Sequence, residues 1–420
     1  MTSLHTLPNG VRIVCDSAPG FETFALSVVA GRGARSEPAD RSGWSHLLEH
    51  MVFKGAGDRS ARQIVESIEA EGGSINAQTG YERTSFQVRG LKGSLPLAMD
   101  VLGDLVLRPT LDAGDLAKEK LVVGQEIAEA ADTPDDHVFE VAQATAWGDH
   151  PLGRPVLGTV ESLAPADPAT LAAWRAALYA PDRLIVSVSG AVDEDEVLRR
   201  VEAAFGDAKG QGAGPTQTPD FVGGLAATSR KLEQAHLVLM LPAVGANDPA
   251  QFALRLLAEA LGGGMSSRLF QEARENLGLA YAIDAYAETY ADAGVLGIYA
   301  GCAARDARAL AEVSAREIVR LADGLPEAEL ARCKALLKAS IFMSRESLTA
   351  RAEHAAGQLL VYGRLMTSQD FAERIDAVTP ADVAAMAGRM AGDGRSAVSV
   401  LGPARAGGAG AAFNRTLFGA

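Results

Sequence analysis

The spacing of apolar positions along the chain predicts strands in alternation with amphipathic helices. The first residues indicate a β-hairpin formed by residues 4–7 and 11–15 around the turn Pro8-Asn9-Gly10, and a third strand follows at 24–29. Ser60 is a suitable N-cap for a helix that ends at Gly72-Gly73. Further helices are predicted at 94–107, 116–131 and 168–178, and further strands at 84–88 and 184–189.

A stretch rich in glycine and proline, residues 209–224, predicts a linker between two parts of similar size. We therefore predict an N-terminal domain over residues 1–208 and a C-terminal domain over residues 225–420. The segment that starts at Leu116 is repeated approximately at Leu330, and the segment that starts at Ala164 is repeated at Thr379. These echoes indicate an internal duplication, although chance similarity between short alanine-rich stretches is an alternative.

Composition and charge narrow the classes of function. A chain of 420 residues with 48% hydrophobic and 22% charged residues is typical of a folded protein of two or more domains. No run approaches the roughly 20 apolar residues of a membrane span, and no export signal is visible. The three cysteines have no pairing pattern, so we expect a cytoplasmic protein without disulfides. The net charge of -14 argues against nucleic acid as a partner; it would suit a cationic ligand, or serve only solubility.

The segment His46-Leu47-Leu48-Glu49-His50 carries the strongest chemical signal. Residues four apart lie on one face of a helix, so His46 and His50 can present both imidazoles to one ion. Glu49 projects beside that face, where a carboxylate can accept a proton from zinc-bound water. The alternative is that both histidines only line a buried face.

A catalytic zinc ion requires a third protein ligand, because it keeps one position open for water. The predicted helix at 116–131 offers three acidic candidates, Glu119, Glu126 and Glu129. Spacing alone does not choose among them. The duplication places Cys333 and Ser340 at the positions of Glu119 and Glu126, so the second half lacks both acids.

The His-x-x-Glu-His motif resembles that of the pitrilysin/insulinase family of zinc metallopeptidases. The chain is most similar to short members related to the catalytic β subunit of the mitochondrial processing peptidase and its bacterial relatives. This resemblance implies that His46, His50 and Glu126 bind one Zn²⁺ per chain and that Glu49 is the general base. It also implies that Glu119 is a supporting acid that orients the ligands.

The resemblance extends to residues that would contact a peptide substrate. Asn76 and Ala77 fall where the family has an edge strand that pairs with the substrate backbone. In the second half, Arg274 and Tyr281 match a substrate-contacting pair of the family.

A second part of the resemblance concerns specificity. Asp136 and Glu140 lie where the processing peptidase has an acidic pair that binds an arginine of its substrate. These residues are four apart and could receive a guanidinium on one helical face. A solvated acidic patch is the alternative.

The family architecture implies an α+β fold with two homologous domains, each an antiparallel-rich mixed sheet covered by helices, which form half of a clamshell. We therefore predict a zinc-dependent endopeptidase that hydrolyses peptides or unfolded segments in an enclosed chamber, with a preference for basic residues near the cleavage site. A homodimer is expected to complete the chamber, and a heterodimer with an inactive homologous chain is the second possibility. The alternatives are a non-catalytic scaffold, like the core proteins of the respiratory cytochrome complex, and a metal enzyme that acts on a smaller amide.

Overall fold

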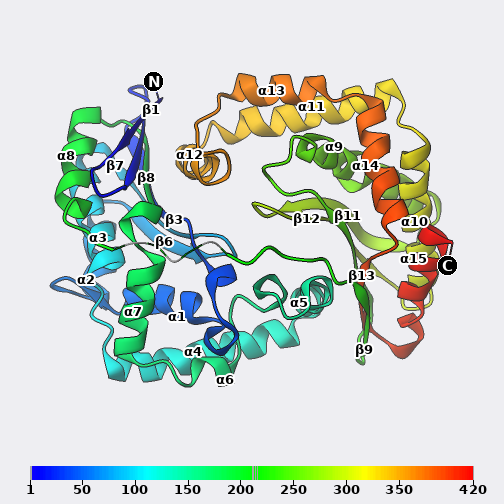
Figure 1. The fold of residues 1–420 in the computed structure, drawn as a ribbon, viewed down its shortest axis with the longest axis horizontal. Coiled ribbons are helices and arrows are strands. Elements are labelled where there is room, and N and C mark those ends of the chain that lie inside the picture. The colour runs from blue at the N-terminus through cyan, green and yellow to red at the C-terminus, as the bar shows by residue number, and fades with distance from the viewer. Residues whose placement is uncertain (1, 211, 213, 215, 420) are drawn as a thin grey trace. The chain divides into compact units, whose positions relative to one another are not determined.

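The structure, a computed structural model, describes residues 2–210, 212, 214 and 216–419 (Figure 1). Residues 211, 213 and 215 of the predicted linker lie outside the described residues. The chain forms two compact units. The first unit consists of Met1–Glu129, Pro155–Thr216 and Met343–Leu365, and the second of Ala130–Arg154, Gln217–Phe342 and Met366–Ala420.

The first unit is built on a six-stranded sheet with the order β1-β2-β8-β3-β7-β6. All neighbouring strands are antiparallel except β2 and β8, which are parallel. The strands are β1 (Thr2–Thr6), β2 (Arg12–Ser17), β3 (Thr23–Ala30), β6 (Ser74–Thr79), β7 (Thr84–Leu91) and β8 (Leu184–Gly190). A separate two-stranded hairpin is formed by β4 (Gly55–Ala56) and β5 (Arg59–Ser60).

The second unit is built on a five-stranded sheet with the order β11-β12-β10-β13-β9. Its strands are β9 (Gly224–Ser229), β10 (Ala235–Ala243), β11 (Ala280–Thr289), β12 (Gly294–Cys302) and β13 (Ala397–Gly402). Only β9 and β13 are parallel. The order and directions repeat those of β6-β7-β3-β8-β2 in the first sheet, so the topology agrees with a duplication. The predicted α+β class, with two antiparallel-rich sheets, is confirmed.

Helices cover both sheets. Those of the first unit are α1 (Trp44–Val52), α2 (Ala61–Ala70), α3 (Leu95–Leu107), most of α4 (Ala113–Asp132), α6 (Val160–Leu163), α7 (Pro168–Leu178), α8 (Glu194–Phe205) and α12 (Leu348–Tyr362). Those of the second unit are α5 (Pro134–Trp147), α9 (Gln251–Gly262), α10 (Ala307–Asp323), most of α11 (Glu327–Ser344), α13 (Ser368–Ala377), α14 (Pro380–Asp393), α15 (Ala409–Phe418) and a π-helix (Phe270–Asn276).

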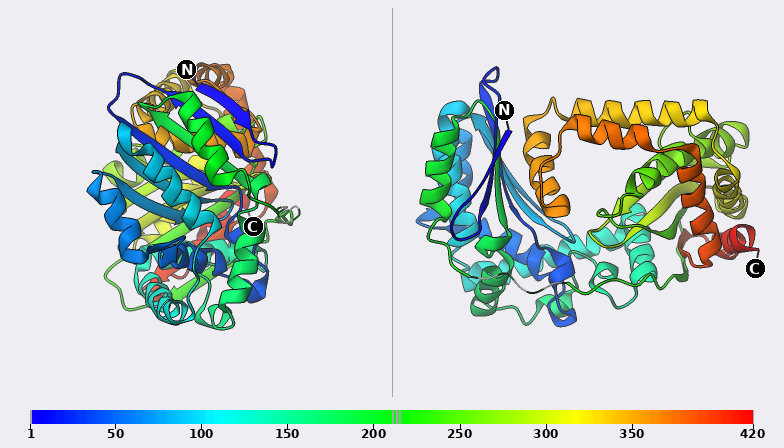
Figure 2. Two further views of the ribbon diagram at one scale, coloured as in Figure 1. Left: turned by 90° about the vertical axis from the view of Figure 1, so that its left-hand side faces the viewer. Right: turned by 45° about the horizontal axis from the view of Figure 1, so that its top comes forward.

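Two helices are exchanged between the halves of the sequence. Helix α12, from the C-terminal half, packs on β2, β3 and β8, on the face opposite to α3 and α8 (Figure 2). Helix α5, from the N-terminal half, packs on the equivalent strands β9, β10 and β13. The compact units therefore do not follow the linear division at residues 209–224, because each sheet is covered on one face by a helix from the other half.

The contact of α12 with the first sheet combines apolar and charged groups. The apolar part includes Val14 and Val29 of the strands and Ala356 of the helix, which are fully buried. Beside it, Arg351 of α12 forms an ion pair with Asp16 of β2 at 2.7 Å, and Asp16 is only 5% exposed. Because unpaired buried charges destabilise strongly, this pair helps to select α12 for this face.

Most predicted elements of the first half agree with the structure. The hairpin forms around Gly10, whose φ of 98° favours glycine. Ser60 caps α2 in a capping box with Gln63. The C-terminal stretch, for which no element was predicted, forms α15 and packs on α10. Within the part of the chain that the structure describes, no helix is both long and apolar enough to cross a bilayer.

Candidate metal centre

Helix α1 presents His46, Glu49 and His50 from a firmly anchored scaffold. Leu47, Leu48 and Met51 are fully buried, so the opposite side of the helix is fixed in the core of the first unit. The buried carboxylate of Glu37 accepts hydrogen bonds from the backbone N–H groups of Gly43 (2.8 Å) and Ser45 (2.6 Å) at the start of the helix. This contact satisfies N–H groups that would otherwise lack acceptors.

Gly43 precedes the helix because a side chain would not fit there. Its φ is 86°, and a Cβ atom would lie 2.4 Å from the carbonyl oxygen of Leu157. The close backbone contact fixes the position at which α1 begins. It therefore also fixes where His46 and His50 point.

The three predicted zinc ligands converge. His46, His50 and Glu126 each offer one ligand atom, and these atoms all lie within 4.8 Å of one another. The two imidazole centroids are 4.6 Å apart, and His50 Nε2 lies 3.6 Å from Glu126 Oε2. Among the described residues, this is the group of three that could bind a metal ion.

Two features of these three residues fit a zinc ion: the chemical type of the ligands, and buried ligand-side atoms that lack hydrogen-bond partners. Two imidazoles and one carboxylate are a ligand set of catalytic zinc sites. Within the described residues, His46 Nδ1 and Glu126 Oε2 are buried and have no hydrogen-bond partner. Such atoms destabilise a fold by about 1–3 kcal/mol each, and a cation bound by this set would offset part of that cost.

Protonation also favours metal binding. Burial, followed by the neighbouring His50, lowers the pKa of His46 to about 4. His46 is therefore neutral at physiological pH, as a metal ligand must be.

His50 is oriented by Glu119. Its Nδ1 atom lies 3.1 Å from Glu119 Oε2, and the side chain of Glu119 is 7% exposed. An ionised carboxylate can only accept, so His50 Nδ1 donates and Nε2 keeps the lone pair that faces Glu126. Lys54 contacts the other oxygen of Glu119 at 2.8 Å.

Glu49 is half-buried, in an environment suited to proton transfer. The hydroxyl of Thr79, at the end of β6, donates to Glu49 Oε2 at 2.5 Å. Burial raises the pKa of Glu49 above its ordinary value, and the hydrogen bond from Thr79 offsets only part of that increase. A raised carboxyl pKa is typical of a general base that works near neutral pH.

The predicted substrate residues of the first half lie on an edge strand. Asn76 and Ala77 belong to β6 and pair with Gln87 and Phe86 of β7. Among the described residues, no strand pairs with the other side of β6. Its outer backbone groups can therefore accept an added strand.

The other four predicted substrate residues lie in the second unit. Asp136 and Glu140 are on α5, where burial and then the charge of Asp136 raise the pKa of Glu140. Arg274 is exposed on the π-helix and stacks on Phe270 at 4.6 Å. Tyr281 is 66% exposed at an irregularity in the pairing of β11 with β12.

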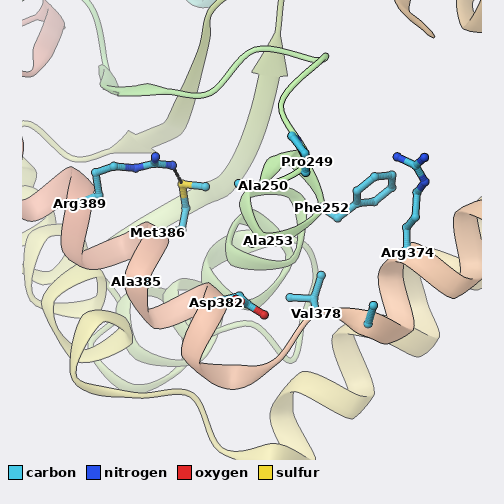
Figure 3. Close-up of a pocket in the computed structure, with 11 residues that line it drawn as sticks. Pro249, Ala250, Phe252, Ala253, Arg374, Val378, Asp382, Ala385, Met386 and Arg389 are labelled. Carbon is cyan, nitrogen blue, oxygen red and sulfur yellow. Dashed lines mark hydrogen bonds between the residues drawn. The ribbon is translucent and has the colours of Figure 1, made fainter.

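A pocket of about 600 Å³ lies in the second unit, between the start of α9, the end of α13 and α14. Phe252 and Met386 contribute to its apolar wall, and Arg374 and Arg389 lie at its two ends (Figure 3). None of the predicted ligands or substrate residues lines this pocket.

Comparison with known proteins assigns the family. The model described as "Insulinase (Peptidase family M16)" matches residues 12–160, and the model "Peptidase M16 inactive domain" matches residues 166–337. The chain belongs to the insulinase family, peptidase family M16. Family members that resemble it over most of their length include an uncharacterized zinc protease of Streptomyces coelicolor, 37% identical over 95% of this chain and 89% of the relative. The uncharacterized zinc protease YmxG of Bacillus subtilis is 37% identical over a match that covers 90% of this chain and 93% of the length of YmxG.

Solved structures share the fold of this family member. A protease from Helicobacter pylori has a TM-score of 0.89 at 22% identity, covering 96% of this chain and 99% of its own. A peptidase M16 inactive domain from Pseudomonas fluorescens has a TM-score of 0.86 at 21% identity, covering 96% and 98%. Complex III2 from Candida albicans contains a chain with a TM-score of 0.83 at 21% identity, covering 95% of each.

Two polar residues of the site were not predicted from the sequence. Thr79 follows Asn76 and Ala77 along β6, so the alternation of a strand could have indicated that it shares a face with Ala77. Lys54 lies four residues after His50, the same helical spacing that identified His46. Thr79 contacts Glu49 and Lys54 contacts Glu119. Both acids are distant in sequence from these partners, so the sequence did not indicate either contact.

Proposed function

We propose that this chain is a zinc-dependent endopeptidase that hydrolyses peptides or unfolded segments. The observation that carries the proposal is the convergence of His46, His50 and Glu126 beside a half-buried Glu49. Relatives that are called zinc proteases and are similar over nearly the whole chain support it.

In this proposal His46, His50 and Glu126 hold one Zn²⁺ per chain. Zinc supplies Lewis acidity, which activates a water molecule and polarises a carbonyl group. Glu49 accepts the proton of the attacking water and then transfers it to the nitrogen of the leaving amine. The hydroxyl of Thr79, which donates to Oε2 of Glu49, would hold the carboxylate in place for this transfer.

Substrate would bind as an added strand along β6. The outward-facing backbone groups of β6, in the stretch that contains Asn76 and Ala77, are suited to pair with an extended peptide, which would recognise the main chain rather than a particular side chain. Arg274 and Tyr281 would provide further contacts, supported by their exposure to solvent.

We also propose that the enzyme prefers substrates with basic residues near the cleavage site. Asp136 and Glu140 are one turn apart on α5, so they could share one guanidinium through charge-assisted hydrogen bonds. The net charge of -14 favours the approach of cationic peptides.

We further propose that the enzyme is a cytoplasmic homodimer in which two copies enclose the reaction. The three cysteines are free and buried, which is compatible with a reducing compartment. Light scattering at micromolar concentration tests the dimer, because a species of only 43.7 kDa would contradict it.

A non-catalytic scaffold is the second candidate. It is favoured by the likeness to a chain in Complex III2 and by the family model named as an inactive domain. The complete donor set favours catalysis, since a scaffold does not need unsatisfied buried polar atoms such as His46 Nδ1 and Glu126 Oε2 at one point.

The deciding experiment is hydrolysis of a quenched fluorescent peptide library by purified protein, with a chelator, with zinc restored and in Glu49→Gln. Cleavage should stop on chelation, return with zinc and fall by at least about 100-fold in the variant, while the variant still binds zinc. Zinc binding by the wild-type protein without cleavage would favour the scaffold, and full activity of Glu49→Gln would contradict the assigned base.

A further inference from the structure

Glu119 is held between two side chains of α1 and the turn that follows it. Its Oε2 atom accepts from His50 Nδ1 at 3.1 Å, and its Oε1 atom lies 2.8 Å from Lys54 Nζ. His50 lies in the last turn of α1 and Lys54 in the turn that follows it, so two neighbouring parts of the chain contact both oxygens of one carboxylate. The orientation of Glu119 is thereby defined at both oxygens.

The backbone of Lys54 is fixed as well. Its N–H donates to the carbonyl of Met51 at 3.1 Å, which continues the end of α1. Met51 is fully buried in the core of the first unit. Lys54 is therefore tied to the end of the helix that carries His50, whereas Glu119 comes from α4.

We propose that Lys54 is a positioning residue of the metal centre. By holding Oε1 of Glu119, it keeps Oε2 directed at His50 Nδ1, which retains the proton on Nδ1 and leaves Nε2 free to bind zinc. This inference rests on the proposed function, because it assigns His50 as a zinc ligand. Lys54 itself touches neither substrate nor metal in this role.

Burial distinguishes this contact from an ordinary surface ion pair. The side chain of Glu119 is 7% exposed, so a lost partner cannot readily be replaced by bulk water. The pair Lys338–Asp376 on the second unit has a similar distance, 2.7 Å, but its carboxylate is 53% exposed. Lys338 is therefore a matched control for the loss of a lysine ion pair.

Two effects of Lys54 on zinc affinity have opposite signs. Its positive charge repels a dication, whereas its hydrogen bond orders the residue that orients a ligand. Glu119 lies between Lys54 and His50 and neutralises the ammonium, so we expect the ordering effect to dominate. Loss of a partner that orients a metal ligand typically weakens metal affinity by about 10–100-fold.

The experiment measures zinc dissociation constants by competition with a chromogenic chelator, in wild type, Lys54→Met, Lys54→Arg and Lys338→Met. We expect Lys54→Met to weaken zinc binding by about 10-fold or more, and the other two variants to stay within about 2-fold of wild type. In the Glu119→Gln background, Lys54→Met should have no further effect if Lys54 acts through Glu119. Thermal unfolding of each variant checks that it is folded.

A second readout uses metal-free protein. Nitrogen chemical shifts of His50 should show the proton on Nδ1 in wild type and a mixture of tautomers in Lys54→Met. Unchanged or tighter zinc binding in Lys54→Met, or an equal loss in the Glu119→Gln background, would overturn the inference. If the wild-type protein binds no zinc, the proposed function fails, and the tautomer measurement still tests Lys54 separately.

Discussion

The hydroxyl of Thr79 donates a hydrogen bond to Glu49 Oε2 at 2.5 Å, and this contact joins the edge strand β6 to helix α1. Thr79 is the last residue of β6 and pairs with Thr84 of β7. The strand proposed to receive the substrate therefore also positions the proposed general base. Substrate alignment and proton transfer depend on the same element.

Removal of this hydrogen bond should slow catalysis without loss of the metal. Thr79→Val keeps a β-branched side chain that suits a strand, but this side chain has no hydroxyl to donate to Glu49. We expect kcat/KM to fall by about 10-fold, since a hydrogen bond to a charged group contributes about 1.5–3 kcal/mol. Zinc content, measured in parallel, should be unchanged.

Thr79→Ser is the matched control, because serine retains the hydroxyl. Its kcat/KM should stay within about 3-fold of wild type, which corresponds to less than about 1 kcal/mol. Equal activity of the valine and serine variants would contradict the role of the hydrogen bond. Loss of zinc from the valine variant would indicate instead that Thr79 supports the ligands.

The identity of the proposed third zinc ligand gives a second prediction. Glu126 lies within reach of both histidines, whereas Glu129, one turn later on α4, is exposed and is not part of the cluster. Glu126→Gln should weaken zinc binding by at least about 10-fold, and Glu129→Gln should leave it unchanged. Competition with a chelator measures both, and the reverse ranking would remove Glu126 from the ligand set.

The sequence predicted the parts of this centre that depend on local geometry. The spacing of His46 and His50 in a helix determines that both imidazoles share one face, whatever surrounds the helix. Spacing did not distinguish Glu119, Glu126 and Glu129 as candidates for the third ligand. The sequence of a helix defines which residues share a face, but it does not define which face turns toward another helix. Only the resemblance to a family indicated Glu126, and the structure brings it to the histidines.

The exchange of α5 and α12 could not be predicted from hydrophobic patterns. Such patterns predict that a helix has an apolar face, but they do not identify the sheet that it covers. A signal was nevertheless present in Asp16 and Ser27, polar residues in strands of the first sheet that are almost fully buried. They required partners, and Arg351 and Glu353 of α12 provide them.

The proposed specificity for basic residues gives a third prediction. The double substitution Asp136→Asn and Glu140→Gln should lower the kcat/KM ratio of an arginine peptide over its norleucine analogue by about 10-fold or more, since charge-assisted hydrogen bonds are lost. Burial and the charge of Asp136 already raise the pKa of Glu140, so neutral replacements should not destabilise the fold. Asp149→Asn, exposed beyond the end of α5, is the control. An unchanged kcat/KM ratio would indicate that Asp136 and Glu140 form only a solvated acidic patch.

The exchanged helix α12 gives a fourth prediction, which concerns stability. Arg351→Met removes the partner of the buried Asp16 and should lower the free energy of unfolding by about 3 kcal/mol at neutral pH. Arg364→Met, exposed just beyond the same helix, should change it by less than about 0.5 kcal/mol. Chemical denaturation of both variants measures the difference.

The loss caused by Arg351→Met should depend on pH. Burial alone would raise the pKa of Asp16, but hydrogen bonds from Arg351, Thr2 and Ser189 outweigh it and hold the pKa below its ordinary value. A carboxyl group with a lowered folded pKa stabilises the fold above its unfolded value of about 3.9, and this contribution disappears as the pH falls through the folded pKa. The variant lacks the part of this contribution that Arg351 provides, so its deficit relative to wild type should shrink as the pH falls below about 4. A deficit that stayed constant in acid would show that Arg351 acts through packing rather than through the charge of Asp16.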